Sequence, residues 1–321
     1  MTPHSIPLST PASSAKVSPF GAELRALRLG SIDLIRSPDS SWEATSPVLF
    51  PIVGWARDGV VRVGGETYPM GVHGFAAAYE FTPIQVAPDH ARFLLRDDPS
   101  TRAAYPFAFE LALDYCLAGE TLGVELAVTN TGGEPMPYAC GLHPGFRWPF
   151  AGGAPEDYRI VFDAAERPAV PVIAPGGLFT AETRAVALEG RVLPLTAELL
   201  AREALCFLDA ASRGLTFEKI GGPGLRIEVD EFPHLALWSR PPSPFLSIEA
   251  WTGHGDPVGF EGTLFDKPSM RVLAPGERAT HTMRISVIPA PLPLSRPDTL
   301  GARRAVRGRA ARRHRARGSA R

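Results

Sequence analysis

Short segments that alternate apolar and polar residues, separated by glycine and proline, make up most of the chain. Residues 109–117 (FELALDYCL) and 122–128 (LGVELAV) alternate with a period of two on either side of Gly119-Glu120, which predicts a β-hairpin. The same pattern predicts hairpins from residues 60–63 with 66–68 and from 79–86 with 91–96. Further strands are predicted at residues 158–163, 215–220, 225–229, 235–239, 245–249 and 280–288.

Helical periodicity is almost absent. The only predicted helix is short, at residues 196–202, with Thr196 as its N-cap. Closely spaced strands without crossover helices pair antiparallel, and so many strands favour two sheets packed face to face over one open sheet. We therefore expect an all-β protein, built as a large two-layer antiparallel β-sandwich.

Charge divides the chain into an acidic body and a basic tail. Nine of the 33 Lys and Arg residues are arginines between residues 303 and 321, where no acidic residue occurs. Residues 1–302 therefore carry a net charge of −10. We expect a flexible N-terminal segment at 1–19, a sandwich domain at 20–290, and a Pro-rich exit with a disordered Arg-rich tail at 291–321. Weak binding through this tail is the only contact with nucleic acid that the sequence favours.

Several classes of protein are disfavoured. The sequence has no stretch of 18 uncharged apolar residues, so we expect no contact with a membrane, and its Ser- and Pro-rich N-terminus does not resemble a secretory signal. Cys116, Cys140 and Cys206 lack CxxC spacing, which favours a reducing compartment over a disulfide framework or a zinc site. We expect a cytoplasmic protein without a metal. The sequence specifies no oligomeric state.

Three short segments contain residues suited to acid–base chemistry. His73 lies in GVHGF, His143 in GLHPGF, and Glu249 in the apolar run FLSIEAW. A carboxylate in such a run is costly to bury unless it has a partner or a task, and two histidines on loops could supply the other half of acid–base catalysis. The alternative is that the histidines are ordinary loop residues. The nearby tryptophans, Trp238 and Trp251 among them, then pack between the sheets instead of stacking on a sugar.

The order of these segments resembles the aldose 1-epimerase (galactose mutarotase-like) family, in its bacterial branch. The resemblance covers roughly residues 20–290 and rests on the segments FPIVG, YPMGVHGFA, GLHPGF with a following proline, LWS, FLSIEAW and LAPGE. It implies a two-layer β-sandwich with an open cleft for a sugar ring. The implied reaction is interconversion of α and β anomers of a hexose or related aldose, without a cofactor.

The resemblance also implies a role for each matched residue. His143 matches the general acid that protonates the ring oxygen, Glu249 the general base, and His73 a second histidine that hydrogen-bonds the sugar. Phe75, Trp238 and Trp251 belong to the same matched segments and are expected to contact the substrate. The family branch tends to have an arginine directly after Gly54, where this chain has Trp55, so Arg57 is the nearest guanidinium for binding a hydroxyl.

Two other functions stay open at this point. Ala77-Ala78 replace the Arg-Asp often found in the family, and together with Trp55 they leave room for a sugar-binding sandwich that has lost turnover. A mutarotase for sugar phosphates is the other alternative. It would require basic residues converging on the cleft, which an acidic body with three lysines does not indicate.

Overall fold

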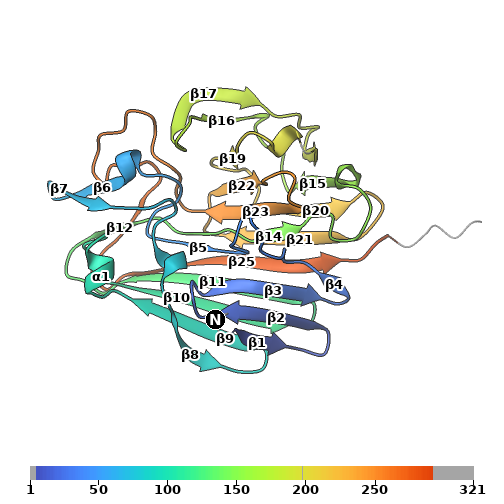
Figure 1. Cartoon of the computed structure of the whole chain (residues 1–321), viewed down its shortest axis with the longest axis horizontal. Coiled ribbons are helices and arrows are strands. Elements are labelled where there is room, and N and C mark those ends of the chain that lie inside the picture. Colours follow the sequence, from blue (N-terminus) through green and yellow to red (C-terminus); the bar gives the residue numbers. More distant parts are fainter. Residues whose placement is uncertain (1–4, 197, 292–321) are drawn as a thin grey trace, which may run out of the picture. The chain divides into compact units, whose positions relative to one another are not determined.

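Nine antiparallel strands form the larger layer of the protein. The computed structural model describes residues 5–196 and 198–291, and its regular structure is almost entirely antiparallel β-sheet (Figure 1). The all-β prediction is therefore confirmed. The order of the large sheet is β18-β15-β20-β21-β25-β11-β10-β9-β8. Its strands are β8 (Thr82–Val86), β9 (His90–Arg96), β10 (Phe109–Ala118), β11 (Thr121–Asn130), β15 (Tyr158–Phe162), β18 (Val192–Pro194), β20 (Gly214–Lys219), β21 (Gly224–Asp230) and β25 (Arg278–Ile288).

Two smaller sheets form the opposite layer. One has the order β1-β2-β3-β4, and the other has the order β19-β22-β23-β13-β5, with β14 also paired to β23. The strands are β1 (Ile6–Ser9), β2 (Ser13–Ser18), β3 (Glu23–Leu29), β4 (Ile32–Asp33), β5 (Val48–Leu49), β13 (Gly141–Leu142), β14 (Gly145–Arg147), β19 (Leu205–Phe207), β22 (His234–Trp238) and β23 (Phe245–Trp251). The two sheets meet where the Arg147 N–H donates to the Leu34 carbonyl at 2.7 Å.

Short elements complete the chain around these layers. They are the two-stranded pairs β6 (Val60–Val63) with β7 (Glu66–Pro69), β12 (Met136–Tyr138) with β24 (Arg271–Leu273), and β16 (Ala169–Ile173) with β17 (Phe179–Ala185), together with α1 (Pro99–Arg102) and the 3₁₀ turns at Arg57–Gly59, Ala76–Ala78, Pro155–Asp157 and Glu198–Leu200. Nowhere in the described residues does a helix have the length and apolar character needed to cross a membrane.

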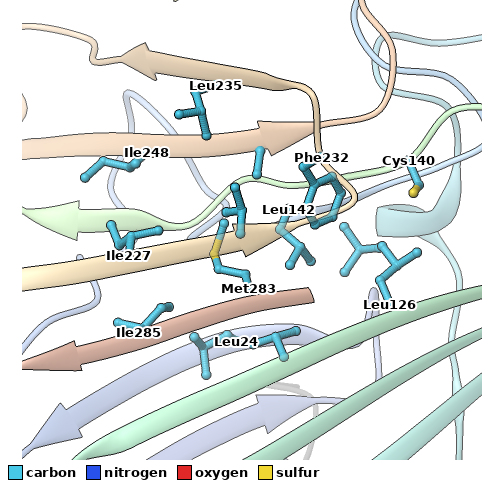
Figure 2. Close-up of a cluster of buried hydrophobic side chains, with 14 of the residues drawn as sticks. Leu24, Leu126, Cys140, Leu142, Ile227, Phe232, Leu235, Ile248, Met283 and Ile285 are labelled. Carbon is cyan, nitrogen blue, oxygen red and sulfur yellow. The ribbon is translucent and has the colours of Figure 1, made fainter. Parts of the chain in front are cut away.

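The core lies between the two layers. Period-two alternation sends one side of every strand inward, so Leu126 of β11 and Ile285 of β25 meet residues such as Leu24 of β3 and Ile248 of β23 (Figure 2). All four of these side chains are buried. The six-stranded sheet is thereby fixed to the large sheet through one of its faces, and its other face is left available to carry polar side chains.

Most of the predicted strands are present. Gly119-Glu120 closes the β10–β11 hairpin, in which Ala118 pairs with Thr121, and the hairpins β6–β7 and β8–β9 also form as predicted. The predicted helix at 196–202 is reduced to the 3₁₀ turn Glu198–Leu200. The Thr196 hydroxyl does accept a hydrogen bond from the Leu199 N–H at 3.2 Å. Leu200 is the one buried residue of this turn, so no apolar face exists to stabilise a longer helix.

The prediction of a flexible segment at 1–19 is wrong for residues 6–18. These residues form β1 and β2, and Leu8, Ala15 and Val17 are buried in the main core. Serine obscured the alternation because it occurs at both kinds of position: Ser9 is exposed, whereas Ser13 and Ser18 are buried. The predicted tail at 291–321 lies outside the described residues, apart from Pro291.

Substitution of Leu8 tests how much the N-terminal hairpin contributes to the stability of the protein. Leu8 is 1% exposed, so Leu8→Ala is expected to lower the free energy of unfolding by about 2–5 kcal/mol. The matched control is Ser9→Ala at the neighbouring, exposed position, which should change it by less than about 0.5 kcal/mol. Chemical denaturation measures both, and equal stability of the two variants would mean that the hairpin does not contribute to the core.

Candidate active site

The pairing of β13 and β14 with β23 places His143 opposite Glu249. Gly141 pairs with Trp251 and Gly145 pairs with Ser247, so the same register continued through the intervening residues sets His143 across from Glu249. Ser247, Glu249 and Trp251 alternate with core residues along β23 and share its outer face. The β-sheet backbone alone therefore brings the two predicted proton-transfer groups together.

Both groups are held by further hydrogen bonds. His143 Nε2 lies 3.2 Å from Glu249 Oε1, and the Trp251 indole N–H donates to Glu249 Oε2 at 3.0 Å. Ser247 Oγ lies 2.8 Å from His143 Nδ1 and donates its proton to the Pro144 carbonyl at 3.1 Å. Nδ1 of His143 is therefore the donor to Ser247. Nε2 and the carboxylate are left to share one proton between them.

Burial shapes the titration of the pair. The Glu249 side chain is 2% exposed and that of His143 is 8% exposed. Removal from water disfavours the charged form of each group, so burial raises the pKa of Glu249 well above its ordinary value and lowers the pKa of His143 well below its own. The pair holds one shared proton, so its net charge is zero whether that proton is on His143 or on Glu249.

A backbone hydrogen bond fixes the ring of His73. Its Nδ1 accepts from the Gly54 N–H at 3.1 Å, so the neutral ring carries its proton on Nε2. Burial lowers the pKa of His73 to about 4, which keeps the ring neutral at pH 7. The backbone of His73 has φ of 63°, a strained value for a residue with a side chain, and its N–H and carbonyl bond to Gly54 and Phe50.

The residue after His73 has to be glycine. Gly74 has φ of 77°, and a Cβ there would lie 2.2 Å from the Phe50 carbonyl oxygen. This close approach lets the loop after β7 pack beside the end of β5, which is next to β13 in the six-stranded sheet. The ring of His73 thereby reaches the His143 ring, with 5.6 Å between the ring centroids.

A buried ion pair anchors the loop that holds His73. Lys267 Nζ donates to Asp256 Oδ1, and both side chains are almost fully buried. Asp256 Oδ2 accepts the Arg57 N–H at 2.8 Å, and the Asp256 N–H donates to the Trp55 carbonyl at 2.9 Å. The segment from Gly54 to Arg57 is therefore tied on both sides, to His73 and to the buried pair.

His73, His143 and Glu249 line a cavity of about 440 Å³. This size lies within the range of about 300–1,000 Å³ that is typical of small-molecule sites. One wall is aromatic. Trp42 and Trp238 lie edge to face at 5.2 Å, and both rings contact that of His143. The turn of the β16–β17 hairpin closes another side, where Gly177 packs so tightly on Trp55 that a Cβ would lie 1.8 Å from the indole ring.

The sequence model of the aldose 1-epimerase family matches residues 4–286. The chain belongs to the aldose 1-epimerase family. This confirms the resemblance drawn from the sequence. The chain is also 31% identical over 258 residues to the chromosomal protein LacX of Lactococcus lactis subsp. lactis, an alignment that covers 77% of this chain and 86% of that protein.

Solved structures share this epimerase fold. A galactose mutarotase-like protein from Lactobacillus casei superposes with a TM-score of 0.82 at 25% identity, covering 88% of this chain and 100% of that one. A galactose mutarotase related enzyme from Lactobacillus acidophilus gives a TM-score of 0.81 at 24% identity, covering 89% and 98%. The galactose 1-epimerase of L. acidophilus gives 0.67 at 17% identity, covering 88% and 94%.

Five of the seven predicted site residues line the cavity of this family member: His73, His143, Trp238, Glu249 and Trp251. Arg57 and Phe75 do not. The Arg57 guanidinium donates to the Phe260 carbonyl at 2.7 Å and lies 3.4 Å from the Glu261 carboxylate, so Trp55 lines the cavity in its place. Phe75 packs behind His73 against Phe50, Tyr79, Tyr105 and Phe109.

Sequence reasoning missed several residues of the site. Ser247, which contacts His143 from behind the cavity lining, had a usable signal, because it is two residues before Glu249 and therefore on the same face of the strand. Arg240 similarly follows Trp238 by two. Trp42 and Arg202 lie on loops, where no periodicity indicates which way a side chain points.

Trp251 provides a test of how the carboxylate is held. Its indole N–H stabilises the charged form of Glu249, so Trp251→Phe is expected to raise the pKa of Glu249 further. The control is Trp238→Phe, because within the described residues the Trp238 indole donates no hydrogen bond to Glu249. A pH titration of the glutamate side-chain ¹³C signals measures both variants. The same Glu249 titration in the two variants would contradict the assignment.

Proposed function

We propose that the protein is an aldose 1-epimerase that interconverts the α and β anomers of a hexose or a related aldose. The observation that carries this proposal is the 3.2 Å contact between His143 Nε2 and Glu249 Oε1 on the wall of a sugar-sized cavity, with His73 beside it. Ring opening of a hemiacetal needs one proton delivered and another removed at two oxygens bonded to the same carbon. Two groups in direct contact that hold one proton between them match this requirement.

The proposed reaction has two balanced steps. His143 gives the shared proton to the ring oxygen while Glu249 takes the proton of the anomeric hydroxyl, the bond from the anomeric carbon to the ring oxygen breaks, and a carbonyl forms. Rotation about the adjacent carbon–carbon bond turns the other face of the carbonyl toward the ring oxygen. As the ring closes, His143 takes its proton back from the former ring oxygen and Glu249 gives its proton to the carbonyl oxygen, so no proton is consumed overall.

His73 and the aromatic wall are proposed to position the sugar. The neutral His73 ring presents an N–H at Nε2, since its Nδ1 is occupied by the Gly54 backbone. This N–H can donate to a sugar oxygen near the anomeric carbon. The faces of Trp42 and Trp238 suit the apolar C–H surface of a pyranose.

The first test of this function is Glu249→Gln. The amide has nearly the same shape and cannot accept a proton, so kcat for mutarotation should fall by roughly 10²–10⁴-fold with unchanged Tm. Polarimetry of freshly dissolved α-D-glucose and α-D-galactose measures the rate. Glu203→Gln is the matched control, since Glu203 lines the same cavity but pairs with Arg184, and it should retain most of the rate.

Two outcomes would contradict the proposal. Wild-type rates in Glu249→Gln would exclude this carboxylate as the base. Sugar binding by calorimetry without any turnover in the wild-type protein would favour a carbohydrate-binding sandwich instead.

The second test is the pH dependence of kcat/KM. Because burial lowers the pKa of His73 to about 4, this ring stays neutral through the ordinary range of histidine titration. We expect kcat/KM to be flat through pH 6.5 and to fall only as the pH drops toward about 4, where a charged His73 would lose the Gly54 N–H and repel His143. Glutamine keeps a hydrogen-bond donor at this position but does not titrate. In His73→Gln, kcat/KM should therefore fall less as the pH drops toward about 4. An inflection near 6.5 that disappears in His73→Gln would contradict the burial argument.

A further inference from the structure

Two arginines without a carboxylate partner line the end of the cavity beyond Trp238. The side chains of Arg240 and Arg202 both belong to the lining, and in the described part of the chain neither forms an ion pair. Glu203, the nearest acid in the sequence to Arg202, is occupied by Arg184, whose Nε lies 3.4 Å and whose Nη2 donates to the Glu203 carbonyl at 3.1 Å. The positive charge at this end is therefore uncompensated.

The pairing of β19 with β22 explains why the two arginines lie at the same end of the cavity. Leu205 pairs with Leu237 and Cys206 with Ala236 in the β19–β22 ladder. Arg202 lies three residues before β19 and Arg240 two residues after β22, so the antiparallel pairing brings both segments to the same end of the ladder. Both arginine side chains belong to the cavity lining, together with Ala204 and Trp238.

One side chain, Trp238, lies between His143 and the Arg240 guanidinium. The rings of His143 and Trp238 are 5.6 Å apart between centroids, and the Arg240 guanidinium carbon lies 6.0 Å from the Trp238 centroid. Arg240 is held in place by donation to the Ser41 carbonyl at 2.5 Å. A sugar whose anomeric carbon lies at His143 and Glu249 would thus extend along Trp238 toward the cation.

We propose that this end of the cavity binds an anionic group on the sugar, a phosphate monoester or a carboxylate on the carbon farthest from the anomeric centre. Planar guanidinium groups bind such oxyanions through paired hydrogen bonds. A positive site is notable on a body that carries a net charge of −10 over residues 1–302. The inference rests on the proposed epimerase function and defines its class of substrate.

The test compares three matched sugars: D-glucose, D-glucose 6-phosphate and D-glucuronate. ¹H exchange spectroscopy of the anomeric signals gives kcat/KM for each after subtraction of the spontaneous rate. We expect at least a tenfold preference for one anionic sugar over glucose, and the preferred one identifies phosphate or carboxylate as the ligand. A preference for neutral glucose, or no preference, would overturn the inference while leaving the epimerase function intact.

Variants separate a bound anion from a general charge effect. Arg240→Gln and Arg202→Gln should each lower kcat/KM for the anionic sugar by about 10- to 100-fold, as expected for loss of a charge-assisted hydrogen bond, with less than about a twofold change for glucose. Arg28→Gln, at an exposed position of β3, removes the same charge elsewhere and should have little effect. Equal losses for glucose and the anionic sugar, or an equal effect of Arg28→Gln, would contradict the proposal. Absence of turnover with all three sugars would instead refute the epimerase function.

Discussion

The buried carboxylate of Glu249 is the constraint on which the site depends. An isolated carboxylate in an apolar strand would cost several kcal/mol, so its neighbours have to compensate for the loss of water. The structure places His143 opposite it on β13–β14 and Trp251 two residues along β23, one contact for each carboxylate oxygen. Ser247, two residues before Glu249 on the same strand, forms a hydrogen bond with His143 and orients its ring. The groups that make burial tolerable are the same groups that make proton transfer feasible.

The two layers have different roles: the nine-stranded sheet stabilises the fold, and the six-stranded sheet carries the candidate site. In the described residues, the nine-stranded sheet supplies no side chain to the cavity lining; it packs against the inner face of the six-stranded sheet and holds its strands in register. The outer face is then free for polar groups. Residues on paired strands are positioned by the backbone hydrogen bonds of the sheet, and the loop carrying His73 is held by Gly54 and by the Asp256–Lys267 pair.

Local signals in the sequence predicted the regular parts of this arrangement. Period-two alternation located the long hairpins, and the carboxylate in FLSIEAW indicated β23, the strand whose Glu249 lines the cavity. The same signals failed where a contact depends on distant segments. The serine-rich β1 and β2 become strands because Leu8 and Val17 are covered by the far layer, and Arg57 turns away from the cavity because Asp256 and Phe260 fix its loop. Contacts with residues far away in the chain produce no local periodicity, so the sequence pattern could not predict them.

The neutral charge of the proton-transfer pair bears on what the cavity can accept. A free Glu249 carboxylate would repel an anionic sugar at close range, and burial would strengthen that repulsion. Because His143 and Glu249 share one proton, the inner end of the cavity has no net charge, whichever group holds it. His73 is neutral as well, as burial keeps its pKa low. In the proposed complex the charge of the sugar is therefore recognised at the other end, by Arg202 and Arg240, and acid–base chemistry at the inner end is compatible with a negatively charged substrate.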